Sequence, residues 1–280
     1  MHNRDIRNLR SIKGNLSFNE PLKKYTSMKV GGPAEIFFQP YDLKELKLFL
    51  SKLDINVPIF WLGRGSNLLI RDQGISGAVI SLLLIKKEII KVNEHCIEVS
   101  ANVPCTMLSR QCMRWGMAPS EFFSGIPGSL GGALTMNAGA YGYETWDTVE
   151  SVKVITRKGK LIERYPPAYK VRYRKVEGPE NEWFVSAKLV FDQKKSASIS
   201  KQREMLSKRK ISQPLGKPSC GSVFKNPKGD YAARLIQEAG LKGYRIGGGK
   251  ISEKHANFII NEDDALASDI ESLIVHVQKE

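Results

Sequence analysis

The sequence predicts an α+β protein that divides into two domains, residues 1–199 and 200–280. At 280 residues, the chain is long enough for two domains, or for one large domain with an appendage. Segments with helical apolar periodicity are mixed with short strand-forming runs, which are densest between residues 150 and 192. A joint punctuated by prolines at residues 213–218 then precedes the C-terminal elements.

The N-terminal third alternates one helix with several strands. Asp42 is expected to cap a helix over residues 43–53, whose leucines recur on one face. A strand is predicted over residues 57–62 because β-branched and aromatic residues follow a proline there. Residues 77–85 predict a buried strand, and residues 88–100 predict two short strands joined by a turn.

The middle of the chain predicts one helix, a β-rich block and a second helix. Proline 104 opens a helix through residue 115, and Gly116 is expected to end it. Strands are predicted over residues 151–156 and 182–191, with a turn between them. Residues 196–211 predict an exposed helix rich in Lys, Arg, Gln and Ser.

The C-terminal region predicts a small α+β unit. A short strand over residues 221–224 is followed by a helix over residues 231–239, which Gly240 is expected to end. A strand over residues 255–261 and a last helix from about residue 263 complete the pattern.

A short glycine loop follows the strand predicted at residues 57–62. Successive backbone N–H groups in such a loop form an anion-binding concavity, and Ser and Asn side chains add hydrogen-bond donors. The loop lacks the third glycine of the dinucleotide fingerprint, because Leu68 stands in its place, and no Gly-Lys-Ser/Thr follows. It therefore predicts a phosphate contact outside those two motifs. Its residues are Gly63, Arg64, Gly65, Ser66 and Asn67.

The most distinctive stretch is PSEFFSGIPGSLGGALTMNAGAYG, residues 119–142, with six glycines and almost no charge. Glycine is retained where backbone approaches something closely or adopts positive φ. Because apolar residues separate these glycines, the stretch is not a flexible linker. The favoured interpretation is a backbone-lined wall around a large flat or polyanionic ligand. The alternative is a tight run of β-turns in a core.

A third segment with candidate functional residues is SCGSVFKNP, residues 219–227, in which Ser222 follows a glycine. None of the four histidines stands in a triad motif with Ser222, which argues against nucleophilic catalysis. A serine hydroxyl can also act as a general acid toward a strongly basic carbanion or enolate. Such a role needs nearby cations, and Lys225 lies three residues on. The alternative is an ordinary hydrogen-bonded serine on a strand.

Composition narrows the function classes. The chain carries a net charge of +14, which favours an anionic partner. The basic residues 194–210 come without an aromatic platform or a zinc finger, so a phosphorylated metabolite is favoured over nucleic acid. The longest apolar run, residues 78–85, is too short to span a bilayer. Four cysteines without metal-ligand spacing predict reduced thiols and no metal site, and a cytoplasmic location is expected.

Five blocks of the chain resemble one family, the UDP-N-acetylenolpyruvoylglucosamine reductases, which are the UDP-N-acetylmuramate dehydrogenases of peptidoglycan synthesis. The match runs from about Leu22 to Glu280, in order and at sensible spacing. Its blocks are YTSMKVGGPAEIFF, GRGSNLLIRDQGISGAVI, GIPGSLGGALTMNAGAYG, PSCGSVFKNP and AARLIQEAGLKGYRIGGGKISEKHANFIIN. The resemblance implies the FAD-binding fold of the vanillyl-alcohol-oxidase (PCMH) type, with a C-terminal α+β substrate domain.

The resemblance also implies a cofactor and a reaction. NADPH would be the hydride donor, FAD would be bound without a covalent link, and UDP-N-acetylglucosamine enolpyruvate would be the substrate. The loop at residues 63–67 would bind the FAD pyrophosphate. The glycine-rich stretch would line the isoalloxazine and adenosine through Gly125, Ile126, Pro127, Gly128, Ser129, Gly131, Gly132, Asn137, Ala138 and Gly139.

Catalytic and substrate-binding residues follow from the same resemblance. Ser222 would protonate the enolate, and Arg174, in a Tyr-Arg pair, would stabilise its carboxylate. Arg172 is a rival two residues away, and the two would share a face if this segment were one strand. Lys225 and Asn226 would contact the substrate. The short span between residues 191 and 214 places the chain in the branch without an extra tyrosine loop.

The chain departs from the family pattern at its C-terminus. Relatives continue into a strand with a glutamate that assists protonation, whereas this sequence stops at Glu280. Glu262 or Glu280 could take that role. FAD binding is expected to be kept, because its blocks lie earlier in the chain, whereas catalytic turnover is the activity that this departure calls into question. Two other functions therefore stay open: a catalytically impaired FAD- or UDP-sugar-binding homologue, and another flavin oxidoreductase acting on a sugar lactone or hydroxy acid.

Overall fold

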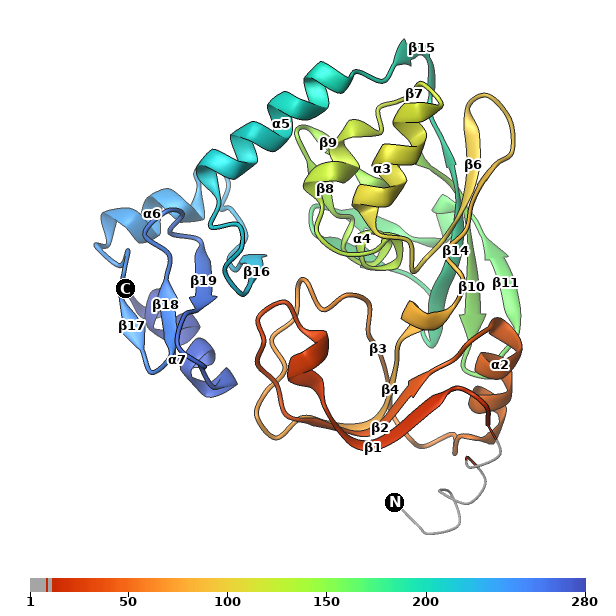
Figure 1. Ribbon diagram of the computed structural model, residues 1–280, viewed down its shortest axis with the longest axis horizontal. Helices are drawn as coiled ribbons and strands as arrows, with labels where there is room; N and C mark the ends of the chain where they lie inside the picture. Colours follow the sequence, from red (N-terminus) through yellow and green to blue (C-terminus); the bar gives the residue numbers. More distant parts are fainter. Residues whose placement is uncertain (1–8, 10–11) are drawn as a thin grey trace. The chain divides into compact units, whose positions relative to one another are not determined.

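The computed structural model describes residue 9 and residues 12–280, which form two compact units (Figure 1). The first unit contains the described residues up to 16 together with residues 38–63 and 80–207. The second contains residues 17–37, 64–79 and 208–280. Each unit is thus assembled from separate stretches of chain. The division into two continuous domains, residues 1–199 and 200–280, stays a prediction.

Short strands and six α-helices make up the described chain. The strands of the first half are β1 (Asn15–Pro21), β2 (Pro33–Gln39), β3 (Ile59–Trp61), β4 (Ile75–Ile80), β5 (Ile89–Lys91), β6 (Cys96–Ser100), β7 (Met117–Ala118), β8 (Gly139–Ala140) and β9 (Tyr143–Glu144). Those that follow are β10 (Val149–Thr156), β11 (Leu161–Arg164), β12 (Lys170–Arg172), β13 (Lys175–Glu177), β14 (Glu182–Val190), β15 (Asp192–Ser196), β16 (Ser219–Ser222), β17 (Arg245–Ile246), β18 (Gly249–Ile251) and β19 (Phe258–Asn261). The helices are α2 (Leu43–Lys52), α3 (Cys105–Arg114), α4 (Leu130–Met136), α5 (Ile199–Ser212), α6 (Ala232–Glu238) and α7 (Ala267–Lys279).

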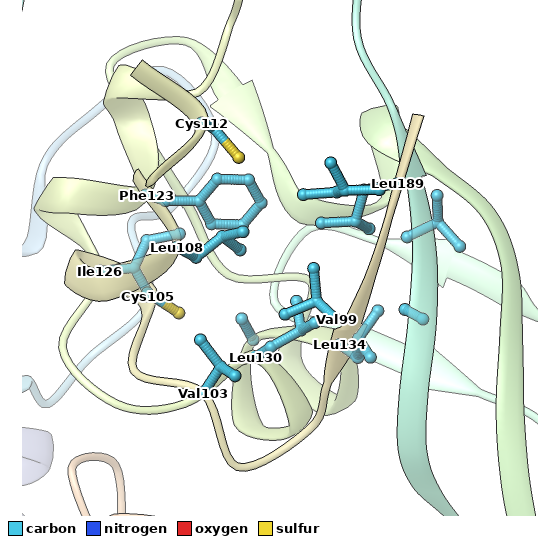
Figure 2. Close-up of a cluster of buried hydrophobic side chains, with 14 of the residues drawn as sticks. Val99, Val103, Cys105, Leu108, Cys112, Phe123, Ile126, Leu130, Leu134 and Leu189 are labelled. Carbon is cyan, nitrogen blue, oxygen red and sulfur yellow. The ribbon is translucent and has the colours of Figure 1, made fainter. Parts of the chain in front are cut away.

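The first unit is built on an antiparallel sheet in the order β11-β10-β14-β6-β5. Its inward side chains form a core with α3, α4 and the short 3-10 helix η3 (Glu121–Gly125). Figure 2 shows Cys105, Leu108 and Cys112 of α3 gathered with Phe123 and with Val99 of β6. Burying these apolar side chains, several of them fully, supplies the main driving force for this packing.

The second unit contains the antiparallel sheet β16-β19-β18-β17, packed with α7. Its core includes Met28 and Val30 from the N-terminal part of the chain. Asp72 also joins that part to α7, because its carboxylate accepts the backbone N–H groups of Ala267 (2.9 Å) and Ser268 (3.0 Å) at the start of the helix. A remaining sheet, β1-β2-β4-β3, contributes residues to both units.

Most predicted elements are confirmed, with corrections at their ends. Asp42 caps α2 through a 2.8 Å bond from the Glu45 N–H, as predicted. The strand predicted at residues 77–85 was too long, since β4 ends at Ile80 and the 3-10 helix η2 (Leu82–Leu84) follows. The cause lies 17 to 20 residues away in the chain: the Asn102 side-chain amide donates to the carbonyls of Leu82 and Ile85 and so stabilises a turn. Likewise β19 begins three residues and α7 about four residues later than predicted.

Candidate functional site

The loop after β3 approaches other parts of the protein closely at two of its glycines. Gly63 belongs to the first unit, where a Cβ atom on it would lie 3.3 Å from the Ser129 Oγ. The predicted loop thus meets the glycine-rich stretch at this pair. Gly65 belongs to the second unit and has φ of +62°, and a Cβ there would lie 2.1 Å from the Tyr25 carbonyl oxygen. Glycine at position 65 is therefore required by the protein's own backbone. Arg64 and Asn67 are exposed.

The glycine-rich stretch contains a helix that the sequence analysis did not anticipate. Residues 130–136 form α4, so the run of β-turns considered as an alternative is wrong. Several of its glycines are required by neighbouring protein atoms: a Cβ at Gly131 would lie 3.1 Å from the Ala101 Cβ, and one at Gly139 would lie 2.5 Å from the Tyr143 carbonyl. Gly132 differs, because an added Cβ would meet nothing within 4 Å.

Asn137 ends α4 in the left-handed conformation, with φ of 41°, and is 1% exposed. Its side-chain oxygen accepts the Trp146 N–H at 3.1 Å, and its Nδ2 donates to the Glu144 Oε2 at 2.6 Å. The same Nδ2 lies 3.4 Å from the Arg172 carbonyl oxygen. The side chain of Asn137 thus has protein partners, and it links the glycine-rich stretch to the hairpin β12–β13.

That hairpin separates the two candidate arginines. Arg172 ends β12, whereas Arg174 lies in the two-residue turn with φ of 55°. The expectation that both side chains share one face of a strand is therefore wrong, because the chain reverses between them. Arg174 donates from Nη2 to the Gly139 carbonyl at 3.0 Å, while Arg172 pairs with Glu177 at 3.7 Å. The structure brings Arg174, but not the Arg172 guanidinium, to the glycine-rich stretch.

Ser222 lies at the exposed end of β16, opposite Phe258 of β19. The preceding Gly221 has φ of +83°, and the pairing register shifts between Ser219 and Ser222. This bulge presents the serine at the end of the strand. Lys225 is exposed three residues later. The side-chain oxygen of Asn226 accepts the Ala232 N–H at 3.2 Å, at the start of α6.

Ser222, Lys225 and Asn226 belong to the second unit, whereas Arg174 and the glycine-rich stretch belong to the first. Within the second unit, Glu262 lies among three cations: Lys217, Arg245 and Lys250, each with a nitrogen 3.5 Å away. Desolvation raises the pKa of Glu262, but the charges of Lys250 and Lys217 outweigh it and leave the pKa below its usual value. Such a carboxylate is a poor proton donor at neutral pH. Glu280 lies near His276 on α7, at 3.9 Å.

Asn257 is a residue of this region that the sequence analysis missed. It is 3% exposed and its side chain bonds the backbone of Phe224, 33 residues earlier. No local pattern indicates a bond over that sequence separation. The one signal in the sequence was its place in the block that carried the family resemblance, two residues after a histidine.

The residues present fit a dinucleotide cofactor. A helix-interior glycine with no protein neighbour, Gly132, leaves room that a side chain would otherwise fill. Asn102 is buried, and its side-chain oxygen has no hydrogen-bond partner among the described residues. Such an orphaned polar atom is uncommon unless a ligand or water completes it. Asn102 follows Ala101, whose carbonyl accepts the Gly131 N–H. In the same stretch as Gly132, Ser129 directly precedes α4 and lies beside Gly63 of the loop predicted to bind phosphate.

No helix within residues 9 and 12–280 is both long and apolar enough to cross a membrane. In the same part of the chain, no group of three or more His, Cys, Asp or Glu side chains is arranged to hold a metal ion.

Comparison with known proteins gives consistent matches along the chain. Residues 34–164 match the FAD binding domain family, and residues 213–280 match the family described as UDP-N-acetylenolpyruvoylglucosamine reductase, C-terminal domain. A UDP-N-acetylenolpyruvoylglucosamine reductase of Coxiella burnetii is 46% identical over 98% of this chain and 93% of its own. One from Alkalilimnicola ehrlichii is 48% identical over 95% of this chain and 90% of its own.

Solved structures agree. The UDP-N-acetylenolpyruvylglucosamine reductase of Thermus caldophilus superposes with a TM-score of 0.81 at 33% identity, over 96% of this chain and 95% of that one. Phl p 4.0202, a glucose dehydrogenase, shares the fold alone, with a TM-score of 0.51 at 15% identity over 68% of this chain and 44% of its own. The predicted α+β flavin-binding fold is confirmed.

Proposed function

The chain belongs to the UDP-N-acetylenolpyruvoylglucosamine reductase family, and from this membership we propose that it reduces UDP-N-acetylglucosamine enolpyruvate to UDP-N-acetylmuramate. It is an FAD oxidoreductase of peptidoglycan precursor synthesis that uses NADPH. The observation that carries this function is the match at 46% identity over 98% of the chain. A cytoplasmic location agrees with the NADPH requirement and is part of the proposal.

FAD would be held by the backbone of residues 63–67 and of the glycine-rich stretch. When bound, it supplies hydride transfer from NADPH to the enolpyruvyl double bond. The space beside Gly132 and the proximity of Gly63 to Ser129 support this placement. The side chain of Asn137 already has protein partners, so its contribution is to shape the end of α4.

Arg174 is the proposed partner of the substrate carboxylate. Hydride addition to the methylene carbon leaves negative charge on the carbon beside the carboxylate, and the carboxylate shares that charge as an enolate. The bond to the Gly139 carbonyl uses one of the five guanidinium N–H groups and fixes the orientation of the others. The ion pair of Arg172 with Glu177 supports choosing Arg174 over its neighbour.

Ser222 is the proposed general acid, and Lys225 and Asn226 are proposed substrate contacts. The Ser222 hydroxyl would donate its proton to the charged carbon, and the serine would then recover a proton from water, since it is exposed. A serine suits this task because an enolate is basic enough to take a proton from a group of high pKa. Lys225 supplies positive charge for the diphosphate or carboxylate. The low pKa of Glu262 argues against that residue as the acid.

Anaerobic absorbance measurements test the proposal. NADPH should bleach the flavin band of the purified protein, and the enolpyruvyl UDP-sugar should restore it. Ser222→Ala should keep the bleaching and lose the recovery, whereas Ser219→Ala, a change in the same strand, should keep both. A protein that takes up no FAD, or that NADPH bleaches but the sugar never restores, would contradict the proposed reaction.

A further inference from the structure

The segment that carries Ser222 is braced by the buried Asn257. Asn257 immediately precedes β19 and is 3% exposed. Its main-chain carbonyl accepts the Val223 N–H at 2.9 Å. Its side-chain oxygen accepts the Phe224 N–H, and its side-chain NH₂ donates to the Phe224 carbonyl, both at 2.8 Å. One residue therefore provides three hydrogen bonds to two consecutive residues of the segment.

These bonds continue the β16–β19 pairing beyond the last strand residue. Ser222 is opposite Phe258, and Asn257 holds the next two residues. By bonding both the N–H and the C=O of Phe224, the asparagine side chain acts as a strand partner would. Bracing from this side matters because the other side of Ser222 is irregular, with the bulge at Gly221.

The far end of the segment is also held. Asn226 bonds the Ala232 N–H, so that residues 222–226 run between the β16–β19 pairing and the start of α6. Asn257 supplies the side-chain contact in the middle of this run. Lys225 directly follows the braced Phe224, so its position depends on the same contact.

Asparagine is required by this pattern of donor and acceptor. Aspartate would keep the acceptor for the Phe224 N–H but would have no donor for the carbonyl, and it would place a charge in a buried setting. Alanine would remove both bonds and leave two part-buried backbone groups without partners. His255 contributes as well, because its Nδ1 accepts the Asn257 N–H at 3.3 Å.

We infer that Asn257 is a positioning residue, one that fixes the Ser222 hydroxyl and Lys225 for proton delivery to the substrate. The inference rests on the proposed function, since it assigns a role toward the proposed general acid. A displacement of about 1 Å at a catalytic group can slow a reaction by about 100-fold. Loosening the Phe224 backbone is expected to affect the sugar-dependent step and to spare flavin reduction, which does not use Ser222.

The test compares Asn257→Asp with Asn257→Ala, and uses Asn261→Ala as a matched control. Asn261 is buried in the same sheet and bonds the Met28 carbonyl and the Ala265 N–H, away from residues 222–226. Rates of flavin reduction by NADPH and of reoxidation by the enolpyruvyl UDP-sugar would be measured separately. Hydrogen exchange at the Phe224 amide would be followed in the cofactor-free protein.

Asn257→Ala should speed exchange at the Phe224 amide because it removes the acceptor, whereas Asn257→Asp keeps an acceptor and loses only the bond to the Phe224 carbonyl. Both variants should slow the sugar-dependent step by about 10- to 100-fold, with flavin reduction changed less than about twofold. Added to Ser222→Ala, the same changes should cause a much smaller loss than in the wild-type protein, because the residue acts largely through the serine. Asn261→Ala should lower stability and leave the sugar-dependent step unchanged.

Equal slowing of both steps, or an undiminished further loss beside Ser222→Ala, would overturn the inference and leave Asn257 a purely structural residue. Unchanged exchange at the Phe224 amide in Asn257→Ala would overturn it as well. If the wild-type protein itself never reoxidises with the sugar, the proposed function fails instead, and the exchange measurement still reports whether the brace exists.

Discussion

Changing Gly132 to alanine should have opposite effects on the protein with and without cofactor. An ideal Cβ at this position meets nothing within 4 Å, so the cofactor-free protein has room for the methyl group. A glycine within a helix costs about 0.5–1 kcal/mol relative to alanine. Gly132→Ala should therefore raise the free energy of unfolding by about that amount, and Tm by about 1–3 °C.

FAD binding should change in the other direction. If the open space beside α4 is part of the cofactor site, the added methyl group overpacks it, at a cost of about 1–3 kcal/mol. The Kd for FAD should then rise by roughly 5- to 150-fold. Thermal unfolding of the cofactor-free protein and a flavin fluorescence titration measure the two effects separately.

The neighbouring glycine provides the control. At Gly131 an added Cβ would lie 3.1 Å from the Ala101 Cβ and 3.2 Å from its carbonyl oxygen, which is tighter than ordinary contact. Gly131→Ala should therefore destabilise the cofactor-free protein. If Gly132→Ala stabilises the protein and leaves the Kd for FAD unchanged, the cofactor does not lie beside Gly132. Destabilisation by Gly132→Ala would show that the cofactor-free protein has no room for a methyl group at this position.

Three further predictions follow from the same structure. Arg174→Lys should slow flavin reoxidation by the enolpyruvyl sugar at least about tenfold, since an ammonium cannot reproduce the planar set of donors proposed to face the carboxylate. Arg172→Lys should change this rate less than about twofold, and equal effects in stopped-flow traces would contradict the choice of Arg174. Gly221→Ala should destabilise the protein by about 1–2 kcal/mol in urea unfolding, because alanine tolerates the φ of +83° poorly although nothing lies within 4 Å of its methyl group. Desolvation raises the pKa of Asp72, but two N–H groups of α7 outweigh it and leave the pKa lowered, so this carboxylate contributes stability above about pH 4 that is lost as the pH falls through its folded pKa. Asp72→Asn should accordingly make the free energy of unfolding fall less steeply between about pH 4 and pH 2. If the free energies of the two proteins, measured by urea unfolding, fall in parallel over this range, this role is refuted.

Local signals were sufficient for most elements of the fold. The cap at Asp42 and the stops at Gly116 and Gly240 give correct helix boundaries because their causes lie within a few residues. The α4 helix was missed because its glycines obscured the helical pattern. The small size of Gly131 is explained by its contact with Ala101, which is distant in sequence.

The same limit applies to the candidate site. The Ser222 and Arg174 motifs were visible in the sequence, and their roles stay predictions. Which arginine lies at the glycine-rich stretch depended on a chain reversal at Tyr173 and Arg174 that no local residue dictated. The brace from Asn257 joins residues 33 positions apart, so only the folded chain reveals it.

The interleaved course of the chain bears on how this protein can be dissected. A fragment starting at residue 200 would lack Met28 and Val30, which belong to the hydrophobic core around α7, and Asp72, which caps that helix. A fragment ending there would in turn carry these residues without their partners. Separately expressed halves should therefore misfold or aggregate alone, and gene fusions or circular permutations that keep residues 17–37 and 64–79 with the C-terminal part are the better route to an isolated second unit.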